Sequence, residues 1–527
     1  MSSTQTGGWW LIGSALTGVA PDILKLLSSL LISIPLSIPI PHLQKLNPIY
    51  FHIYSISISI YFLTGIFNLK SGFIQLLLDS LITYFICQHY IIPLSQEKDK
   101  DGSKKSKAKR MVWGIFAGLL THLTFNHSKR IIWKIPYETV EITGAQMVLV
   151  MKLSTFTWNV YDGHHRSKAE LDSYQSITSI TKLPSLLEFL SYCFFFPCLL
   201  VGPAIPFKDY MNFYSRNNLS SPNRFQDSFK SLILGFGFAG LVGIYGSTWS
   251  YEKMLEDQFL NKSWIQRFLH VQIAGFMARS RYYLVWLFAQ ASVTISGCGY
   301  NPMTLKSDIG QNIDITKIEF AQNYKGIFDH WNMKTNIWLR ETVYKRVSEL
   351  NIKESDGKVK VKKPGFGSTM ATFAASAAWH GPLPAYFFVF LSGGVLQALA
   401  RSIRRSIRPF FLNSSSTLAL KSSYDFLSLI LTQTNLNYLV IPFVLLDLKK
   451  SYLAYRLIGF YGHLSVGILL IFLWGFGFEK VLIKKLSNSS DLVTKNSINS
   501  TTSNTSVENS SKLGITDCMN PNMTVLQ

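Results

Sequence analysis

Long, nearly uncharged apolar stretches follow one another along most of this chain. A helix needs about 20 apolar residues to cross the hydrocarbon core of a bilayer, and several stretches reach that length. Shorter stretches predict tilted, broken or re-entrant helices packed inside the protein. The candidates are 22–41, 47–67, 71–94, 111–126, 143–158, 185–206, 228–247, 263–278, 280–298, 366–379, 383–400, 425–446 and 452–474. Charged residues make up 15% of the chain, against about 25% in soluble proteins. The sequence predicts an all-α polytopic membrane protein with about ten to twelve transmembrane or re-entrant helices.

Three basic runs interrupt the apolar stretches and carry much of the net charge of +21. They lie at 98–110, 345–363 and 401–408. Lys and Arg favour cytoplasmic loops, so all three should face the cytosol. Six candidate spans separate the first run from the second, and two separate the second from the third. These even numbers predict a lumenal N-terminus and a cytosolic tail. The runs lie between spans and form no separate basic domain, so no nucleic-acid partner is expected.

The last part of the chain differs in composition from the rest. From 486 to 527 it is rich in Ser, Asn and Thr, which predicts disorder, so the membrane domain is expected at 1–485. The five cysteines are scattered without a CxxC pair, so neither a disulfide framework nor a metal site is expected. They are Cys87, Cys193, Cys198, Cys298 and Cys518.

A single histidine, His380, stands in the apolar, small-residue segment 374–390. An ionisable residue inside a membrane is costly and marks a functional site by default. Histidine is also the side chain best suited to move a proton near neutral pH. A buried histidine satisfied by a neighbouring carbonyl is an equally open interpretation of this residue alone.

The segment 329–347 mixes aromatic and cationic residues. Helical spacing places Thr335, Trp338, Thr342 and Lys345 along one flank. This pattern is typical of an interfacial helix that extends its basic side chains to water. Asn332 lies near the start of this helix, and a fixed amide there could orient a catalytic base or donate to a developing oxyanion.

Taken together, these two segments resemble the signature of the membrane-bound O-acyltransferase family, and within it the fungal lysophospholipid acyltransferases. The matching residues are Trp331-Asn332-Met333, Thr335, Trp338-Leu339 and, about fifty residues later, Ser376-Ala377-Ala378-Trp379-His380-Gly381. Further similar blocks lie at 141–147, 158–163, 184–203, 281–286 and 296–301. The likeness is close over roughly 110–400, the motif core.

The resemblance implies helices around an intramembrane catalytic chamber, and transfer of an acyl chain from acyl-CoA to the hydroxyl of a lysophospholipid. It implies His380 as general base and Asn332 as the second catalytic residue. Substrate contacts are expected from Trp331, Thr335, Trp338, Arg340, Trp379, Gly381, Lys362 and Lys363, with the lysines meeting the phosphates of acyl-CoA. Acyl-CoA is a co-substrate, so no cofactor is expected. The family likeness also places the protein among membrane lipids in the endoplasmic reticulum.

Other interpretations remain open from the sequence. Related proteins acylate sterols, diacylglycerol or secreted proteins, although the blocks at 141 and 184 favour the lysophospholipid branch. A transporter with His380 in a proton relay would have inverted repeats, and none is found. Five further polar residues could line a lipid cavity or pair structurally: Glu141, Gln146, Asn159, Asp162 and Glu188. Gln290 departs from the family pattern, where a glutamate is frequent.

Overall fold

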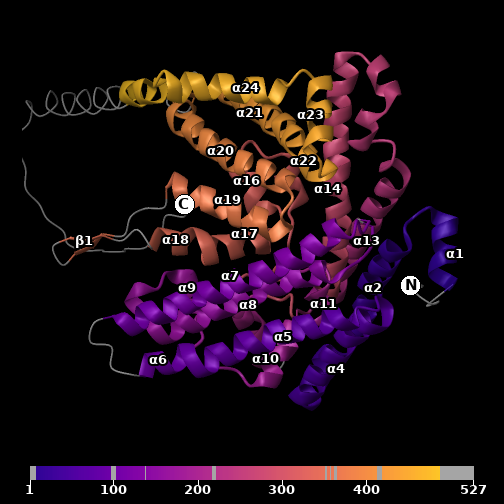
Figure 1. Ribbon diagram of the computed structural model, residues 1–527, viewed down its shortest axis with the longest axis vertical. Coiled ribbons are helices and arrows are strands. Elements are labelled where there is room, and N and C mark those ends of the chain that lie inside the picture. The colour runs from indigo at the N-terminus through magenta and orange to yellow at the C-terminus, as the bar shows by residue number, and fades with distance from the viewer. Residues whose placement is uncertain are drawn as a thin grey trace, which may run out of the picture. The chain divides into compact units, whose positions relative to one another are not determined.

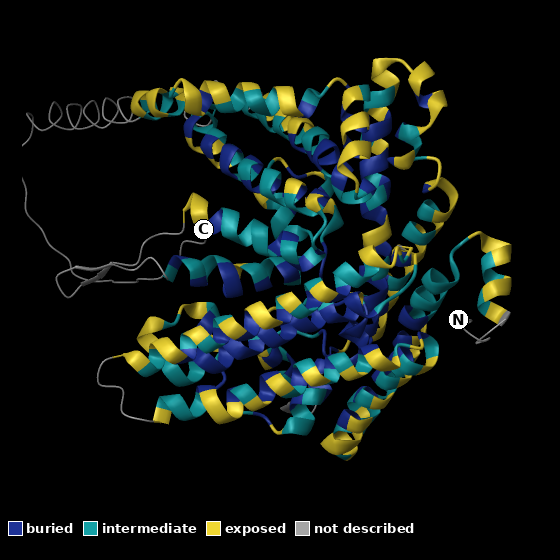
Figure 2. Ribbon diagram, viewed as in Figure 1, coloured by how far each residue is buried: buried dark blue, intermediate teal, exposed yellow. Residues whose placement is uncertain are grey.

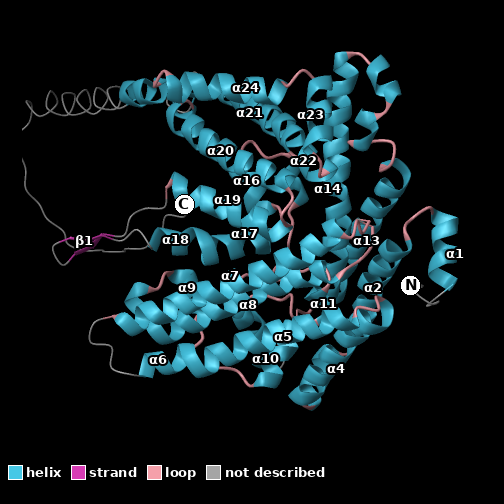
Figure 3. Cartoon of the chain, in the orientation of Figure 1, coloured by secondary structure: helices cyan, strands magenta, loops and turns pink. Residues whose placement is uncertain are grey.

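The protein is almost entirely helical (Figures 1 and 3). The computed structural model describes residues 8–96, 102–136, 138–215, 221–349, 353–355, 358–360, 365–411 and 418–486. By its internal contacts, the chain divides into a large unit, 1–400 with 422–467, and a small unit, 401–421 with 468–527. The all-α prediction is confirmed. The exception is one short antiparallel pair, β1 (Lys353–Ser355) and β2 (Lys358–Lys360), in which Glu354 faces Val359.

The N-terminal part of the large unit contains long helices that start at prolines or polar caps. Asn47, for example, accepts a hydrogen bond from the Ile49 amide and so caps the helix that Pro48 begins. The elements are α1 (Gly8–Thr17), α2 (Pro21–Ser37), α3 (Ile40–Leu46), α4 (Pro48–Ile60), η1 (Tyr61–Ile66), α5 (Lys70–Ile86), η2 (Cys87–Ile91), α6 (Ile92–Gln96), α7 (Ser103–Ile132) and α8 (Ile142–His165).

The middle part alternates short helices with two long ones. Capping boxes begin several of them, because a Ser or Asp side chain and a Glu or Gln three residues later satisfy free amides reciprocally. Ser185 with Glu188 and Ser263 with Gln266 are two of these. The elements are η3 (Lys168–Glu170), α9 (Ser173–Thr178), α10 (Leu186–Cys193), α11 (Phe196–Leu199), α12 (Phe207–Ser215), α13 (Arg224–Tyr245), η4 (Glu252–Leu255), η5 (Asp257–Asn261) and α14 (Trp264–Ile295).

The two motif segments fall in the next part of the chain. Its elements are α15 (Ile315–Glu319), α16 (Tyr324–His330), α17 (Met333–Leu339), η6 (Arg340–Tyr344), α18 (Lys345–Glu349), α19 (Phe366–His380), α20 (Pro384–Ser406) and η7 (Arg408–Phe411). The remaining elements are α21 (Leu418–Leu439), α22 (Ile441–Leu445), α23 (Leu448–Leu457), α24 (Tyr461–Leu470) and η9 (Ile471–Gly475). Within the small unit, the Trp474 indole donates to the Ser402 hydroxyl at 3.1 Å, and Arg405 pairs with Glu479.

The main core of the large unit gathers around α8, which packs against α5, α7 and α10 (Figures 1 and 2). Nearly every residue of α8 from Ile142 to Asp162 is buried, including Lys152 and Asp162. By contrast, α13 leaves Phe229, Ile233 and Phe236 exposed, as expected of a helix that faces lipid. Helix α8 therefore lies in the interior of the large unit, and its buried polar side chains are surrounded by protein.

Among the residues that the structure describes, five helices are long and apolar enough to cross a membrane, and up to seven spans result if each of two sharply bent helix pairs is one. The five are Pro48–Ile66, Lys70–Gln96, Arg224–Tyr245, Pro384–Ser406 and Leu420–Leu445. Other long helices, such as α7, α8 and α14, contain charged and amide residues and are not in this set. A multi-pass membrane architecture is confirmed. The ten to twelve helices predicted from the sequence are more numerous, because that prediction also counted re-entrant helices.

One detail of the span prediction is wrong. The stretches 263–278 and 280–298 were expected as two spans, but most of both lies in a single helix of 32 residues, α14. Arg279, which separates them in sequence, is no break, because its guanidinium pairs with Glu319 at 2.6 Å inside the protein. Of the five apolar helices, Arg224–Tyr245 is the one that lies between the first two basic runs in the described part of the chain. The count of six spans between these runs is therefore not reproduced, and the orientation stays a prediction.

Candidate active site

His380 is the last residue of α19, and Gly381 ends the helix. Gly381 has φ +127°, a value that residues with a side chain rarely adopt. A Cβ at this position would also lie 3.2 Å from Cγ of His127. The Trp-His-Gly motif therefore needs its glycine for both the backbone turn and the close approach of α7.

Aromatic rings hold the His380 imidazole in place. It stacks on Phe390 with centroids 4.9 Å apart and meets Phe443 edge to face at 5.2 Å, with Tyr386 at 5.5 Å and Trp379 at 4.7 Å. Neither imidazole nitrogen has a hydrogen-bond partner among the described residues. Among the described residues, no carbonyl accepts a hydrogen bond from His380, so the alternative interpretation of a structurally satisfied histidine is not supported. The ring is fixed by packing, and its nitrogens remain available to a substrate.

Asn332 stands at the turn between α16 and α17 with φ +45°, in the left-handed region. Hydrogen bonds determine which way its amide points. The backbone N–H of Lys334 donates to Asn312 Oδ1 at 3.1 Å, so Asn312 Nδ2 must point the other way. That nitrogen donates to Asn332 Oδ1 at 3.1 Å, and the Thr335 hydroxyl donates to the same oxygen at 2.8 Å. The Asn332 oxygen is therefore satisfied, and its Nδ2 has no acceptor among the described residues.

A preoriented N–H group with no protein acceptor suits the stabilisation of negative charge that develops on a substrate oxygen. Asn332 and His380 lie on or beside α17 and α19, which pack against each other. A general base and an amide donor on neighbouring helices can together serve attack of a hydroxyl on a carbonyl carbon.

Three further motif residues tie these helices to α8. Trp338 donates its indole N–H to Ser154 at 2.8 Å, and Trp379 donates to the Met147 carbonyl at 2.9 Å. The two indole rings lie 5.7 Å apart, and Thr335 also contacts the Met151 sulfur at 3.2 Å. The contacts that the structure gives Thr335, Trp338 and Trp379 are with protein, and their role as substrate contacts stays a prediction.

The other predicted substrate contacts lie in separate environments. Trp331 packs among Tyr282, Tyr283 and Trp286, with ring centroids 5.1–5.8 Å away. Arg340 is on η6, where its Nε donates to Glu341 at 2.9 Å, and it is not brought to His380 by any described contact. Lys362 and Lys363 lie outside the described residues.

The sequence did not reveal two residues that contact the motif segments, Asn312 and His127. Asn312, in the loop before α15, orients Asn332. His127, on α7, lies against Gly381, where a Cβ would come 3.2 Å from its Cγ, and its Nε2 is buried without a partner among the described residues. His127 ends an apolar stretch in the sequence, a signal too common to mark it as a neighbour of a residue 253 positions later.

The polar residues whose roles the sequence left open mostly pair structurally. Asp162 takes both terminal nitrogens of Arg346, one of them at 2.9 Å, and both side chains are at most 2% exposed. Glu188 caps α10, and Glu141 lies 3.5 Å from Arg130. Asp162 and Glu141 therefore join neighbouring helices and Glu188 stabilises the start of its own helix. The described contacts do not place these side chains in a lipid cavity.

Gln146 belongs to a buried polar network between α5, α7 and α8. Its side-chain oxygen accepts from Asn126 at 2.8 Å, and its nitrogen lies 3.1 Å from His122. His122 in turn contacts Asp79 at 2.9 Å and Gln75 at 3.1 Å. The network fixes α7 and α8 relative to each other at Asn126 and Gln146. These residues adjoin His127, which lies against Gly381, and Met147, which accepts from Trp379.

Comparison with known proteins bears on this arrangement. The profile of the membrane-bound O-acyltransferase family matches residues 56–441, which include both motif segments. The chain belongs to the membrane-bound O-acyltransferase family. It is a multi-pass membrane protein, as members of that family and its apolar helices indicate. The resemblance drawn from the Asn332 and His380 segments is thereby confirmed.

Curated relatives extend the match beyond the family profile. The lysophospholipid acyltransferase of Schizosaccharomyces pombe is 36% identical over 473 residues, 87% of this chain and 87% of that protein. The lysophospholipid acyltransferase of Saccharomyces cerevisiae is 33% identical over 78% of this chain and 67% of its own length. The human membrane-bound glycerophospholipid O-acyltransferase 2 is 30% identical over 64% of this chain and 65% of its own length.

Proposed function

We propose that this chain is a lysophospholipid acyltransferase, which transfers an acyl chain from acyl-CoA to the free hydroxyl of a lysophospholipid. The proposal depends mainly on one observation. In a chain of this family, the imidazole of His380 is surrounded by aromatic side chains and has no hydrogen-bond partner among the described residues. The names of the Schizosaccharomyces pombe and Saccharomyces cerevisiae relatives support lysophospholipid as the acceptor.

In the proposed reaction, a neutral nitrogen of His380 accepts the proton of the lipid hydroxyl as the oxygen attacks the thioester carbonyl. The C–O bond forms, and the carbonyl oxygen becomes a tetrahedral oxyanion. Asn332 Nδ2 donates a hydrogen bond to that oxygen, because its own oxygen is already held by Asn312 and Thr335. The C–S bond then breaks, and the leaving thiolate takes the proton from His380, which returns to its neutral form.

The proposal requires no cofactor, since the thioester already activates the acyl group. Both substrates carry long apolar chains, so the reaction takes place in a membrane, and we place it in the endoplasmic reticulum. The cytosolic basic runs would meet acyl-CoA as it arrives from the cytosol.

The test is acyl transfer by membranes that contain this chain, supplied with labelled oleoyl-CoA and a panel of lysophospholipids, sterol and diacylglycerol. We expect labelled phospholipid that disappears in His380→Ala, with the variant still present in the membrane. His89→Ala is the matched control, because His89 is exposed on η2 and stacks only on Phe85 among the described rings. Labelled sterol ester or triacylglycerol would assign another acceptor, and normal turnover by purified His380→Ala would refute the proposed base.

A further inference from the structure

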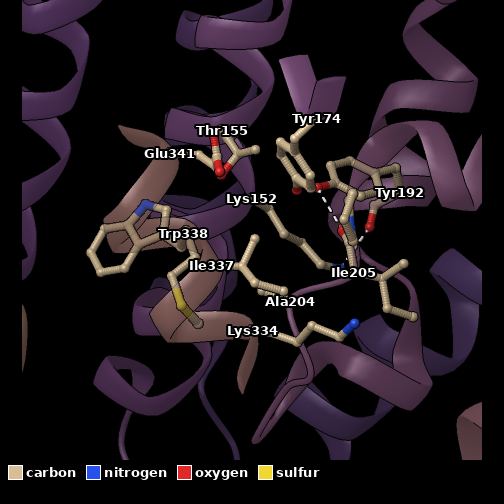
Figure 4. Close-up of a pocket in the computed structure, with 12 residues that line it drawn as sticks. Lys152, Thr155, Tyr174, Tyr192, Ala204, Ile205, Lys334, Ile337, Trp338 and Glu341 are labelled. Carbon is tan, nitrogen blue, oxygen red and sulfur yellow. Dashed lines mark hydrogen bonds between the residues drawn. The ribbon is translucent and has the colours of Figure 1, made fainter. Parts of the chain in front are cut away.

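A small cavity is lined by residues of α8 and α17, together with Tyr174, Tyr192 and residues 204–206 (Figure 4). It holds about 340 Å³ of empty space when its mouth is counted, and the part that water can enter measures about 20 Å³, which is room for about one water molecule. Two lysines line it, Lys152 from α8 and Lys334 from α17. Neither lysine has a role in the mechanism above.

Both lysine side chains extend toward the side of the cavity where Tyr192 and Ile205 lie (Figure 4). Lys152 is 2% exposed. Its ammonium donates to the carbonyl oxygens of Tyr192 at 2.8 Å and Cys193 at 3.4 Å, which are the last residues of α10. Carbonyls at a helix C-terminus attract a cation but carry only partial charge, so they do not neutralise it.

Lys334 has no such partner. Its ammonium makes no hydrogen bond or ion pair with any residue that the structure describes. Glu341 also lines the cavity, but its two oxygens already take Arg340 at 2.9 Å and Lys345 at 2.7 Å. Asp209 acts on Lys334 at longer range and forms no ion pair with it.

Two ammonium groups thus lie at one cavity, and no carboxylate of the described residues forms an ion pair with either, although Asp308 as well as Asp209 acts on Lys334 at longer range. Such an arrangement is costly, because a buried charge needs a partner of opposite sign. A ligand that brings negative oxygens would supply that partner. Lysine ammonium groups are compact charges with three donors each, which suits a tetrahedral anion. One oxygen of such a group can enter the space that a water molecule would fill, while the rest stays at the mouth.

We infer that this cavity is a subsite for a phosphate group of a substrate, held by Lys334 and Lys152. The inference rests on the proposed function, in which both substrates carry phosphate: the lysophospholipid in its head group and acyl-CoA in its nucleotide part. The position of the cavity supports it, since Lys334 follows Asn332 by two residues, and Met151, another lining residue, contacts Thr335. A phosphate here would place its substrate next to the proposed oxyanion donor.

The experiment compares purified Lys334→Met with wild-type protein. Methionine keeps most of the length and removes the charge, and a neutral side chain is cheaper to bury than an ammonium, so the variant should fold. We expect the KM of one substrate to rise about tenfold, for the loss of a charge-assisted hydrogen bond, with kcat within about twofold. A rise for lysophospholipid assigns the head group, and a rise for acyl-CoA assigns the nucleotide part.

Two variants serve as controls. Lys334→Arg keeps the charge and should keep most of the affinity. Lys325→Gln removes an exposed lysine on the preceding helix, where its only described partner is Asp329, and should leave both KM values unchanged. Unchanged KM values for both substrates in an active Lys334→Met enzyme would overturn the inference.

A binding measurement separates this inference from the proposed function. Coenzyme A without an acyl chain, and separately a lysophospholipid, are added to the solubilised protein and the melting temperature is recorded. One of them should stabilise wild type and not Lys334→Met. If wild type transfers no acyl chain to lysophospholipid, the proposed function fails, and the melting shift still decides the phosphate site. Equal shifts in both proteins, or none in wild type, would refute the site.

Discussion

The orientation of the Asn332 amide leads to a sharp prediction for Asn312→Asp. In the wild type, Asn312 uses its oxygen for the Lys334 backbone N–H and its nitrogen for the Asn332 oxygen. An aspartate keeps the first bond but has no N–H for the second. The Asn332 amide then gains by rotating, so that its Nδ2 donates to the new carboxylate. Its oxygen would then point where its N–H₂ pointed before.

The expected cost follows from that rotation. The oxyanion loses a donor and meets an oxygen instead, and loss of one such donor lowers kcat by about 10²–10³, or about 2.7–4 kcal/mol of transition-state stabilisation. Folding stability should also fall, because Asn312 is 2% exposed and the new carboxylate would be buried with only the Lys334 backbone N–H and the Asn332 amide as donors. The assay is kcat at saturating acyl-CoA and lysophospholipid, together with the melting temperature of the same preparation.

Matched variants make the result decisive. Asn323→Asp is the control, since Asn323 uses only its side-chain oxygen, to cap α16 at the Gly326 amide, and aspartate caps equally well. Asn332→Ala should match Asn312→Asp, and the double variant should lose little more, because both changes remove one donor. Wild-type kcat in a folded Asn312→Asp protein would refute the reasoning. The kcat of Asn332→Ala would then show whether the proposed orientation of the Asn332 amide or its role as oxyanion donor is wrong.

Two other substitutions test the supports of the site. His127→Ala removes the imidazole that lies against Gly381 and opens space next to the residue that follows His380, so kcat should fall about 10- to 100-fold through misplacement, with KM nearly unchanged; wild-type kcat would exclude a positioning role. Asp162→Asn should cost about 3–5 kcal/mol of folding stability, because it leaves the buried Arg346 with only partial compensation. That loss would appear as a lower melting temperature, and an unchanged one would show that the pair is not needed for stability.

Much of the fold could be predicted from the sequence, because the relevant information is local. Apolar runs identify helices, and caps such as Ser185 with Glu188 lie three residues apart. The division of α14 into two spans failed for a non-local reason. Arg279 resembles a break in an apolar run, but Glu319, 40 residues later, neutralises it inside the protein. A charged residue marks the end of a membrane span only where it stays in water, and Arg279 instead pairs with Glu319.

The site could be predicted only as far as its motifs. Asn332 and His380 stand in recognisable segments, whereas Asn312 and His127 do not. Asn312 acts through one hydrogen bond across a turn, and His127 acts through contact with a glycine on another helix. Such partners depend on how α7, α8, α17 and α19 are placed, which periodicity does not specify.

The same contacts explain why so many polar residues in this family core need not touch substrate. Trp338, Trp379 and Asp162 use their polar groups on protein partners, so they fix helices that would otherwise slide along apolar surfaces. Lipid gives helices little reason to prefer one register, since it is as apolar as their side chains, and directed hydrogen bonds must supply that preference. A polar atom without a protein partner is then the exception that suggests a ligand. Within the described residues, His380, the Nδ2 of Asn332 and the ammonium of Lys334 are such atoms on or beside α17 and α19. Buried atoms without a partner also lie on other helices, such as Nε2 of His127 on α7 and Nδ2 of Asn159 on α8.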